Sequence, residues 1–476
     1  MLVWSAINRG RRMRRKLIGT VLEFVELEPR VLERAEHPIS RRDIDANVLK
    51  VLYRLAGAGH DAYLVGGGVR DLMLSRRPKD FDVATSAHPQ QVRELFRNSR
   101  LIGRRFRLVH VFFGRQNVEV ATFRRQAEAV AEGEDPLIRL DNTFGTPQED
   151  AFRRDFTVNA LFYSPQSFQV IDFPGGVDDL KARLIRTIGD PELRMREDPV
   201  RMMRAVRFAA KLGFEIEPAT RAAIERHRAD LAKASRPRLV DETYKTLAQP
   251  EAAHALVLME ELGLLESVMP IVSAHLKSRA GTLAEQAVVR NMAAMGLAIA
   301  GGYAPEHPIV LSALILDLYR DEHRKVGSKR IDLLGELRAH GFARGDTEQM
   351  RLILEAFENL ANPTRRTRRL MRRPYFPDAR LFFEMTAPTY SIDATHLMRW
   401  LSDPSAFTIH PTNPGGANPP GSQPSPNGQR RRRRRRRRSR RGSINHAATL
   451  TPTATTSEDP HRENESPQSP EPNRRE

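Results

Sequence analysis

The chain has 476 residues, a formal net charge of +18 and no cysteine, and 40% of its residues are hydrophobic. This length predicts two or three domains with a sizeable buried core. The lack of cysteine excludes disulfides, thiolate metal sites and cysteine nucleophiles, and it fits a reducing cytoplasm. No apolar run reaches the roughly 18 residues of a transmembrane helix, and no signal peptide follows the basic N-terminus. We therefore expect a cytoplasmic protein.

A positive charge of this size indicates a polyanionic partner. The end of the chain, from Arg430 onward, contains 14 arginines and 6 acidic residues, a net of +8. The rest of the chain therefore carries +10, and the tail alone does not account for the excess.

Hydrophobic periodicity predicts an α/β unit over residues 41–189, preceded by a weakly periodic N-terminal extension, residues 1–40. Its first predicted helix covers Ile44 to Leu55. Proline and glycine at the segment ends support the assignments that follow. Strands are predicted at residues 62–65, 81–85, 108–113, 118–123 and 168–172, and further helical segments at 69–74, 89–96 and 152–164.

From Asp190 to about Ser402 the pattern is almost wholly helical, and we divide it into residues 190–250 and 251–408. Residues 409–476 begin with a Pro/Gly/Ser/Asn linker and continue with an arginine run. Such a segment cannot bury enough apolar surface to offset its ordering entropy. The predicted fold is an α/β head with a small mixed sheet, an all-α body and a disordered basic tail.

The segment LVGGGVRDLMLSRRPKDFDVAT, residues 64–85, carries the first signs of chemistry. Gly66 and Gly67 stand where a strand turns into a helix, so their backbone N–H groups can approach phosphate oxygens. Arg70, one turn later, could reach a triphosphate or the returning chain. A glycine turn alone is weak evidence, because most such turns only reverse the chain.

Asp80 and Asp82 make the assignment more specific. Residues i and i+2 of a strand share a face, and two carboxylates there repel each other unless a cation lies between them. Two magnesium ions would relieve this repulsion and stabilise an in-line phosphoryl displacement. The alternative is a solvated edge strand with two surface aspartates. Asp80 stands fourteen residues after the glycine turn, and apolar residues flank the pair. We therefore favour the metal site.

Glu119 is a further possible metal ligand. It alternates with Val118 and Val120, which should face the core, so its own side chain is free to face the aspartates. An ordinary surface glutamate is an equally good interpretation of this residue.

The segment 63–85 resembles a motif of the class II nucleotidyltransferases, the family of bacterial poly(A) polymerases and tRNA CCA-adding enzymes. Two more segments resemble family motifs in the same order, RRDFTVNAL (153–161) and REDPVRMMRAVRFAAKLGF (196–214). The resemblance covers residues ~40 to ~250, and three ordered motifs make chance agreement improbable.

The resemblance implies a template-independent transferase that adds nucleotides to RNA 3′ ends, with ATP as substrate, two Mg²⁺ ions and a role in mRNA processing and transcription. It implies catalytic carboxylates at Asp80, Asp82 and Asp155, although Asp155 could equally orient a ribose or an arginine. It implies nucleotide contacts from Gly66, Gly67, Arg70, Arg153, Arg154, Asn159, Glu197, Asp198, Arg201 and Arg204. Salt bridges within a helix are the alternative for Glu197, Asp198 and Arg201.

Three features favour the poly(A) polymerase subgroup over CCA addition. They are the basic segment 101–114, the N-terminal segment 37–55 and the basic tail. Arg104, Arg105 and Arg107 in the first of these suit RNA or a triphosphate. CCA addition stays open as the related alternative, and an inactive RNA-binding protein as the non-enzymatic one. The arginine run could bind RNA phosphates, proteins of RNA decay or an acidic membrane surface.

Overall fold

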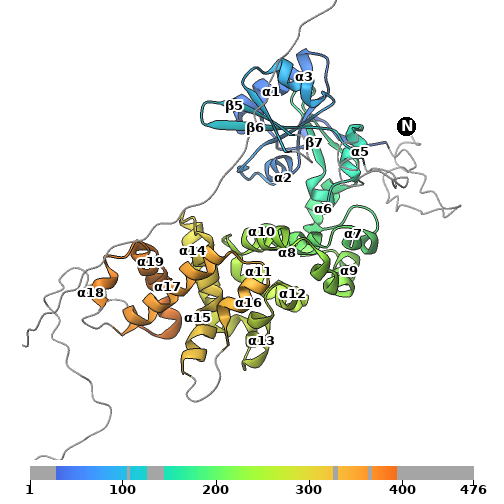
Figure 1. Cartoon of the computed structure of the whole chain (residues 1–476). Coiled ribbons are helices and arrows are strands. Elements are labelled where there is room, and N and C mark those ends of the chain that lie inside the picture. The colour runs from blue at the N-terminus through green and yellow to red at the C-terminus, as the bar shows by residue number, and fades with distance from the viewer. Residues whose placement is uncertain (1–27, 104–107, 126–143, 325–330, 363–366, 394–476) are drawn as a thin grey trace, which may run out of the picture. The chain divides into compact units, whose positions relative to one another are not determined.

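The computed structural model describes residues 28–103, 108–125, 144–324, 331–362 and 367–393. It contains a head built on one sheet and a long succession of helices (Figure 1). The predicted fold class, a mixed sheet with helices followed by an all-α body, is thereby confirmed. The predicted tail, residues 409–476, lies outside the described residues.

Eight strands form the sheet of the head, in the order β1-β8-β7-β2-β3-β6-β5-β4. Strands β3 and β6 run parallel, and every other neighbouring pair is antiparallel. The bounds are β1 Arg30–Leu32, β2 Ala62–Val65, β3 Asp82–Thr85, β4 Ser99–Ile102, β5 Leu108–Phe113, β6 Gln116–Thr122, β7 Leu161–Ser164 and β8 Gln169–Asp172.

Helix α1 (Ala46–Gly57) covers one face of this sheet. Asp45 caps its N-terminus by accepting a hydrogen bond of 2.7 Å from the backbone N–H of Asn47. Its buried stripe, Val48, Val51, Leu52 and Leu55, shares one core cluster with Val83, Val118 and Val120 of the sheet. Because side chains alternate along a strand, the residues between these valines point to the other face.

The remaining α-helices of the head lie in the connections that follow its strands. They are α2 (Gly67–Met73), α3 (Pro89–Leu95), α5 (Pro147–Phe152) and α6 (Gly176–Ala182). Asp172 caps α6 by accepting hydrogen bonds of 2.9 Å from the N–H groups of Gly175, Gly176 and Val177. A Cβ at Gly176 would lie 2.2 Å from the carbonyl oxygen of Thr157, so only glycine lets α6 approach the 153–161 segment this closely.

The prediction of a helix over residues 152–164 is wrong for most of its length, because α5 ends at Phe152, a single 3-10 turn covers 157–159 and residues 161–164 form strand β7. Leu161 and Tyr163 belong to one core cluster and Phe162 to the other. A strand that is buried on both faces reads as an unbroken apolar run, which periodicity cannot distinguish from a helix. Strands β1 and β4 were not predicted, and β1 falls within the segment expected to be an extension.

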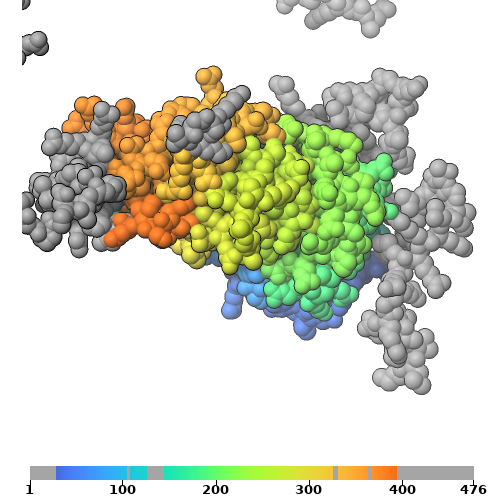
Figure 2. Space-filling view, turned by 90° about the horizontal axis from the view of Figure 1, so that it is seen from below, coloured from blue at the N-terminus to red at the C-terminus, as the bar shows by residue number. Residues whose placement is uncertain are grey.

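The helical part contains α7 (Pro191–Glu197), α8 (Val200–Leu212), α9 (Pro218–His227), α10 (Arg236–Leu247), α11 (Ala252–Glu261), α12 (Leu264–Val268), α13 (Pro270–Ser278), α14 (Ala287–Ala300), α15 (His307–Arg324), α16 (Leu333–Ala339), α17 (Arg344–Ala361), α18 (Thr367–Leu370) and α19 (Phe376–Thr386). A two-residue parallel pair, β9 (Leu184–Ile185) with β10 (Glu215–Ile216), lies at its beginning. Figure 2 shows the packed surface of these helices in green through orange. None of the helices that the structure describes is long and apolar enough to cross a membrane.

Candidate active site

Asp82 and Glu119 are direct neighbours in the sheet. They are register partners in the parallel pairing of β3 with β6, and the next pair, Val83 with Val120, faces the core under α1. Both carboxylates therefore lie on the face of the sheet opposite to α1. The sequence predicted that Glu119 lies on the same face as the aspartates, and the pairing with Asp82 agrees with this. Its role as a metal ligand stays a prediction.

The pKa of Asp82 is raised by its surroundings. Partial burial of its carboxyl group raises this pKa first, and the charges of Glu119 and Asp80 raise it further, to about 6, against an opposing effect of Arg154. Although Asp82 keeps solvent access, protein atoms surround its carboxyl group closely enough to disfavour the ionised form. A carboxylate with this property is poised to bind a cation.

Asp80 reaches this site from a loop. Strand β3 begins at Asp82, so the argument that residues i and i+2 share a strand face applies to Asp80 only in part. Its backbone carbonyl lies 3.4 Å from the position that a Cβ would take on Gly68, which packs this loop against α2. Its charge is nevertheless close enough to raise the pKa of Asp82.

The glycine turn borders the carboxylates. Gly66 has a φ of +71° and a ψ of −135°, a conformation that residues with a side chain rarely adopt. A Cβ at this position would lie 3.2 Å from Nη1 of Arg154 and 3.9 Å from Oδ2 of Asp82. The turn therefore brings its backbone beside the guanidinium of Arg154 and the carboxylate of Asp82. A guanidinium can bind the phosphates of a nucleotide, and a carboxylate can bind the cation that accompanies them.

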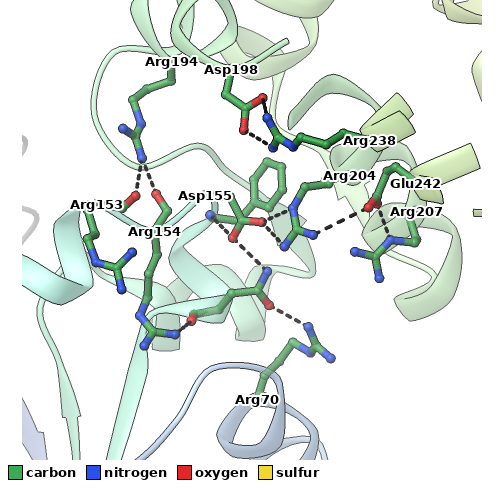
Figure 3. A network of polar contacts seen from close by, with 12 residues as sticks. Arg70, Arg153, Arg154, Asp155, Arg194, Asp198, Arg204, Arg207, Arg238 and Glu242 are labelled. Atoms are coloured by element: carbon green, nitrogen blue, oxygen red, sulfur yellow. Dashed lines mark hydrogen bonds and ion pairs between the residues drawn. The ribbon is translucent and has the colours of Figure 1, made fainter. Parts of the chain in front are cut away.

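The side chain of Arg70 is buried and binds other side chains of the protein. Only 2% of its surface is exposed. It donates to Asp71 Oδ1 at 2.8 and 2.7 Å and, from Nη1, to Asn159 Oδ1 at 2.6 Å. Of the two partners considered for Arg70, a triphosphate and the returning chain, the structure shows contact with the returning chain. Figure 3 shows Arg70 pointing toward the amide group that it binds.

Asp150, which sequence analysis did not single out, orients two arginines. It is 1% exposed and accepts from Arg153 at 2.8 and 2.6 Å and from Arg154 at 3.2 and 2.8 Å. Burial opposes ionisation of Asp150, but Arg154 and Arg153 outweigh it and lower the pKa. The signal in the sequence was the Thr146–Glu149 capping box, which starts α5 and places the next residue inward.

Asp155 is bound on both oxygens. Oδ2 lies 2.8 Å from Nε and 2.7 Å from Nη2 of Arg204, and Oδ1 accepts from Asn159 at 3.2 Å and from the N–H of Phe156 at 2.8 Å. Burial would raise the pKa of Asp155, but Arg204 more than offsets this, so the pKa lies below its usual value. In this structure Asp155 orients an arginine, one of the roles considered for it.

The network continues through the helices in Figure 3. Arg204 lies 3.7 Å from Glu242 of α10, and that carboxylate also accepts from Arg207 at 2.5 Å. Buried Arg194 donates to the carbonyl of Arg153 at 2.8 Å and to that of Arg154. The backbone just before Asp155 is therefore held by a helix that follows it by about forty residues.

The residues expected to face the base lie close together and are paired within the protein. Glu197 lies 2.8 Å from Arg194 and 3.1 Å from Arg201, while Asp198 accepts from Arg238 at 3.1 and 2.8 Å. The helix salt bridges considered as the alternative are thus present. They can also hold the same groups in place for a base, so both interpretations persist.

Among the residues that the structure describes, no group of three or more His, Asp or Glu side chains is arranged to hold a metal ion. Asp80, Asp82 and Glu119 still fit one in chemistry, because burial and then the charges of Glu119 and Asp80 raise the pKa of Asp82, and a cation would favour its ionised form. Nε2 of His110 lies 3.6 Å from Glu119 Oε2. Three predicted contacts, Arg104, Arg105 and Arg107, lie outside the described residues.

Two family models match the chain. Residues 62–186 match the poly A polymerase head domain, and residues 213–276 match the probable RNA and SrmB-binding site of polymerase A. Residues 62–186 are thus similar to the poly A polymerase head domain. This head contains the glycine turn, the three acidic residues and the 153–161 segment, which confirms the resemblance drawn from the motifs.

Curated relatives agree with this assignment. The chain is 50% identical over 252 residues to poly(A) polymerase I of Escherichia coli O6:H1, covering 52% of this chain and 54% of that protein. It is 39% identical over 220 residues to the CCA-adding enzyme of Bacillus velezensis, covering 46% and 54%. The matched part thus spans about half the length of these relatives.

A solved structure extends the likeness in fold. The CCA-adding enzyme of Bacillus stearothermophilus in complex with CTP matches with a TM-score of 0.54 and 28% identity, over 75% of this chain and 88% of that one. The head and a large part of the helices therefore share their arrangement with this enzyme.

Proposed function

We propose that the protein adds adenylates to RNA 3′ ends without a template and releases pyrophosphate. The observation that carries this proposal is the identity of 50% over 252 residues to a poly(A) polymerase I, against 39% over 220 residues to a CCA-adding enzyme. The convergence of Asp82, Glu119 and Asp80 beside the Gly66 turn supports it on physical grounds, because nucleotidyl transfer needs a cation beside a phosphate-binding turn.

In the proposed reaction, the 3′-oxygen of RNA attacks the α-phosphorus of ATP. A phosphodiester bond forms, the α–β phosphoanhydride bond breaks, and pyrophosphate leaves. Asp80 and Asp82, with Glu119 as a third ligand, would hold two Mg²⁺ ions, which supply charge neutralisation at the attacking and leaving oxygens. The Gly66–Gly67 turn would bind the triphosphate through backbone N–H groups, with Arg154 beside it.

Asp155 enters the proposal mainly as a positioning residue. Its contacts with Arg204 and Asn159 fix the segment that also carries Arg153 and Arg154. A catalytic role for Asp155 stays a prediction. Base selection is assigned to Glu197, Asp198 and Arg201, whose ion pairs hold their polar groups in fixed positions.

RNA would lie along the helical part, mainly through phosphate contacts. We assign nucleotide and RNA binding to residues 190–250, the remaining helical body to 251–408 and a supporting role to the tail, residues 409–476.

If the tail binds RNA, deletion of residues 410–476 makes log affinity fall less steeply with log salt concentration. Equal slopes for the two chains would assign the arginine run to a protein of RNA decay or another partner. A cytoplasmic location stays a prediction.

CCA addition is the second candidate, because the head is similar to both kinds of enzyme. The two are separated on tRNA that lacks its 3′ end. A CCA-adding enzyme extends this tRNA by three nucleotides only when CTP is supplied with ATP, as its name states. A poly(A) polymerase forms long products from ATP alone, and an inactive RNA-binding protein releases no pyrophosphate in either reaction.

A further inference from the structure

Helix α1 presents a second stripe of side chains beside its buried one. Ala46, Leu49, Lys50, Tyr53 and Arg54 recur at the spacing of a single helix face and line a common cavity. Tyr53 is 39% exposed, whereas the buried stripe of the same helix packs under the sheet. Among the described residues, no element covers this face of α1 completely.

The cavity has a volume of about 630 Å³. Its other walls come from the end of α3, the start of β4 and the end of β5, through Phe96, Asn98 and Phe113. Because α1 lies on the face of the sheet opposite to Asp82 and Glu119, the cavity is separate from the candidate active site. Its volume is in the range of small-ligand sites.

Aromatic rings and cations dominate the lining. The guanidinium carbon of Arg54 lies 5.2 Å from the centre of the Phe96 ring. Nζ of Lys50 donates to the amide oxygen of Asn47 at 3.3 Å, and among the described residues neither cation forms an ion pair with a carboxylate. Asp45 is the acid with a recorded charge interaction with Lys50, and it is engaged in capping α1.

The Tyr53 ring is fixed in place by its hydroxyl group. The hydroxyl accepts from Arg41 at 2.6 Å and donates to the carbonyl of Pro165 at 3.2 Å. A ring held at its far end and exposed on one side is a ready stacking surface for a planar group. Cations at the rim of such a surface favour a planar ligand that also carries negative charge.

We propose that this cavity binds a nucleotide of single-stranded RNA, with the base on Tyr53 and the phosphates on Lys50 and Arg54. The proposal rests on the proposed function, which supplies RNA as the substrate. Base stacking on aromatic side chains combined with a cationic path for the backbone is how proteins bind single strands without reading their sequence. The site would hold RNA at a distance from the reacting 3′ end.

The test is fluorescence anisotropy of labelled oligo(A) RNA with the full chain, without ATP, over a range of salt concentrations. Tyr53→Ala should weaken binding about tenfold with little change in salt dependence, because it removes a stacking surface and no charge. The double variant Lys50→Ala/Arg54→Ala should reduce the slope of log affinity against log salt by about 1.4, which is the value for two contacts with a single strand.

Two controls keep the result interpretable. Tyr53→Phe loses the hydroxyl contacts and keeps the ring, so its affinity should stay within about twofold of the wild type. Arg30→Ala/Lys181→Ala removes two exposed cations, on β1 and α6, that lie outside the cavity and the candidate active site, and its salt slope should be unchanged. Equal losses for Tyr53→Phe and Tyr53→Ala, or equal slopes for the two double variants, would overturn the proposal.

A free nucleotide is the competing occupant. Binding of AMP that depends on Tyr53, with RNA affinity unchanged in Tyr53→Ala, would assign the cavity to a small molecule and overturn the RNA assignment. The binding assay does not depend on catalysis. If the wild type incorporates no nucleotide but shows the predicted binding pattern, the proposed function fails and the RNA site stands.

Discussion

Oδ2 of Asp155 lies 2.8 Å from Nε and 2.7 Å from Nη2 of Arg204, which joins the loop after α5 to helix α8. The Asp155 side chain is 12% exposed and that of Arg204 33%, and Arg204 lowers the pKa of Asp155 against the effect of burial. This pair is the central link of the network that extends from Arg70 through Asn159 to Glu242 (Figure 3).

We predict strong energetic coupling between Asp155 and Arg204. Each single alanine variant should be destabilised, because it leaves one charged group without its partner. The double variant should be destabilised by less than the sum, with a coupling free energy of about 0.5 to 3 kcal/mol in urea unfolding. Because the folded-state pKa of Asp155 is lowered, this stabilisation is present above the unfolded pKa and is lost as the pH falls through the folded value. Additive losses would show that the contact contributes little.

Asp82→Asn and Asp80→Ala should each reduce nucleotide incorporation by about a hundredfold or more, because each removes a carboxylate from the proposed cation site. Both side chains are exposed, so the fold should survive, which circular dichroism and thermal unfolding can check. Asp61→Ala, at an exposed aspartate just before β2, serves as the matched control and should retain activity. Activity within about tenfold of the wild type for both site variants would refute the assignment.

The raised pKa of Asp82 predicts a pH effect on cation binding. Because protons compete with the cation, Mn²⁺ affinity measured by electron paramagnetic resonance should fall about tenfold between about pH 7 and pH 5, as Asp82 protonates near pH 6. The remaining affinity of Asp82→Asn should depend much less on pH over this range. A flat profile in the wild type would show that Asp82 is ionised throughout.

The same shift predicts that Asp82 destabilises the protein when no cation is present. When the pKa of a carboxyl group is higher in the folded than in the unfolded state, the protein loses stability as the pH rises from about 4 to about 6. The loss persists above that range. With EDTA at neutral pH, Asp82→Asn should therefore melt at a higher temperature than the wild type. An equal or lower melting temperature would contradict the raised pKa of Asp82.

Arg201→Ala should lower the discrimination between ATP and the other nucleotides more than it lowers the general rate. Arg201 lies 3.1 Å from Glu197, which Arg194 also binds, so its loss frees the polar groups assigned to base selection. Single-nucleotide incorporation with each NTP measures the ratio. A uniform loss of rate with unchanged selectivity would show that this helix face has a structural role only.

The sequence predicted those parts of the site that depend on local pattern. The strand–glycine turn–helix unit around Gly66 and the strand carrying Asp82 follow from hydrophobic alternation and turn residues, and both are present. The short edge strands β1 and β4 and the fully buried β7 were missed, since their pairing partners rather than their own residues define them.

The contacts of charged residues were less predictable. Motif position suggested that Arg70 could bind a substrate, but burial and the distant Asn159 determine its actual contact. The role of Arg194 could not be inferred from spacing, because its partner Arg153 lies about forty residues away along the chain and only the fold brings the two together. Asp150 pairs with Arg153 and Arg154, three and four residues away, so its role could have been inferred from the local spacing.

The central claim is that the head transfers adenylates to RNA. Its most direct test is incorporation onto a generic single-stranded RNA with each of the four nucleoside triphosphates supplied separately, together with Mg²⁺. The account predicts long products with ATP, little extension with CTP, GTP or UTP, and no product from Asp82→Asn with any of them. Extension of this RNA by Asp82→Asn at the wild-type rate, or no incorporation of ATP by the wild type, would contradict it.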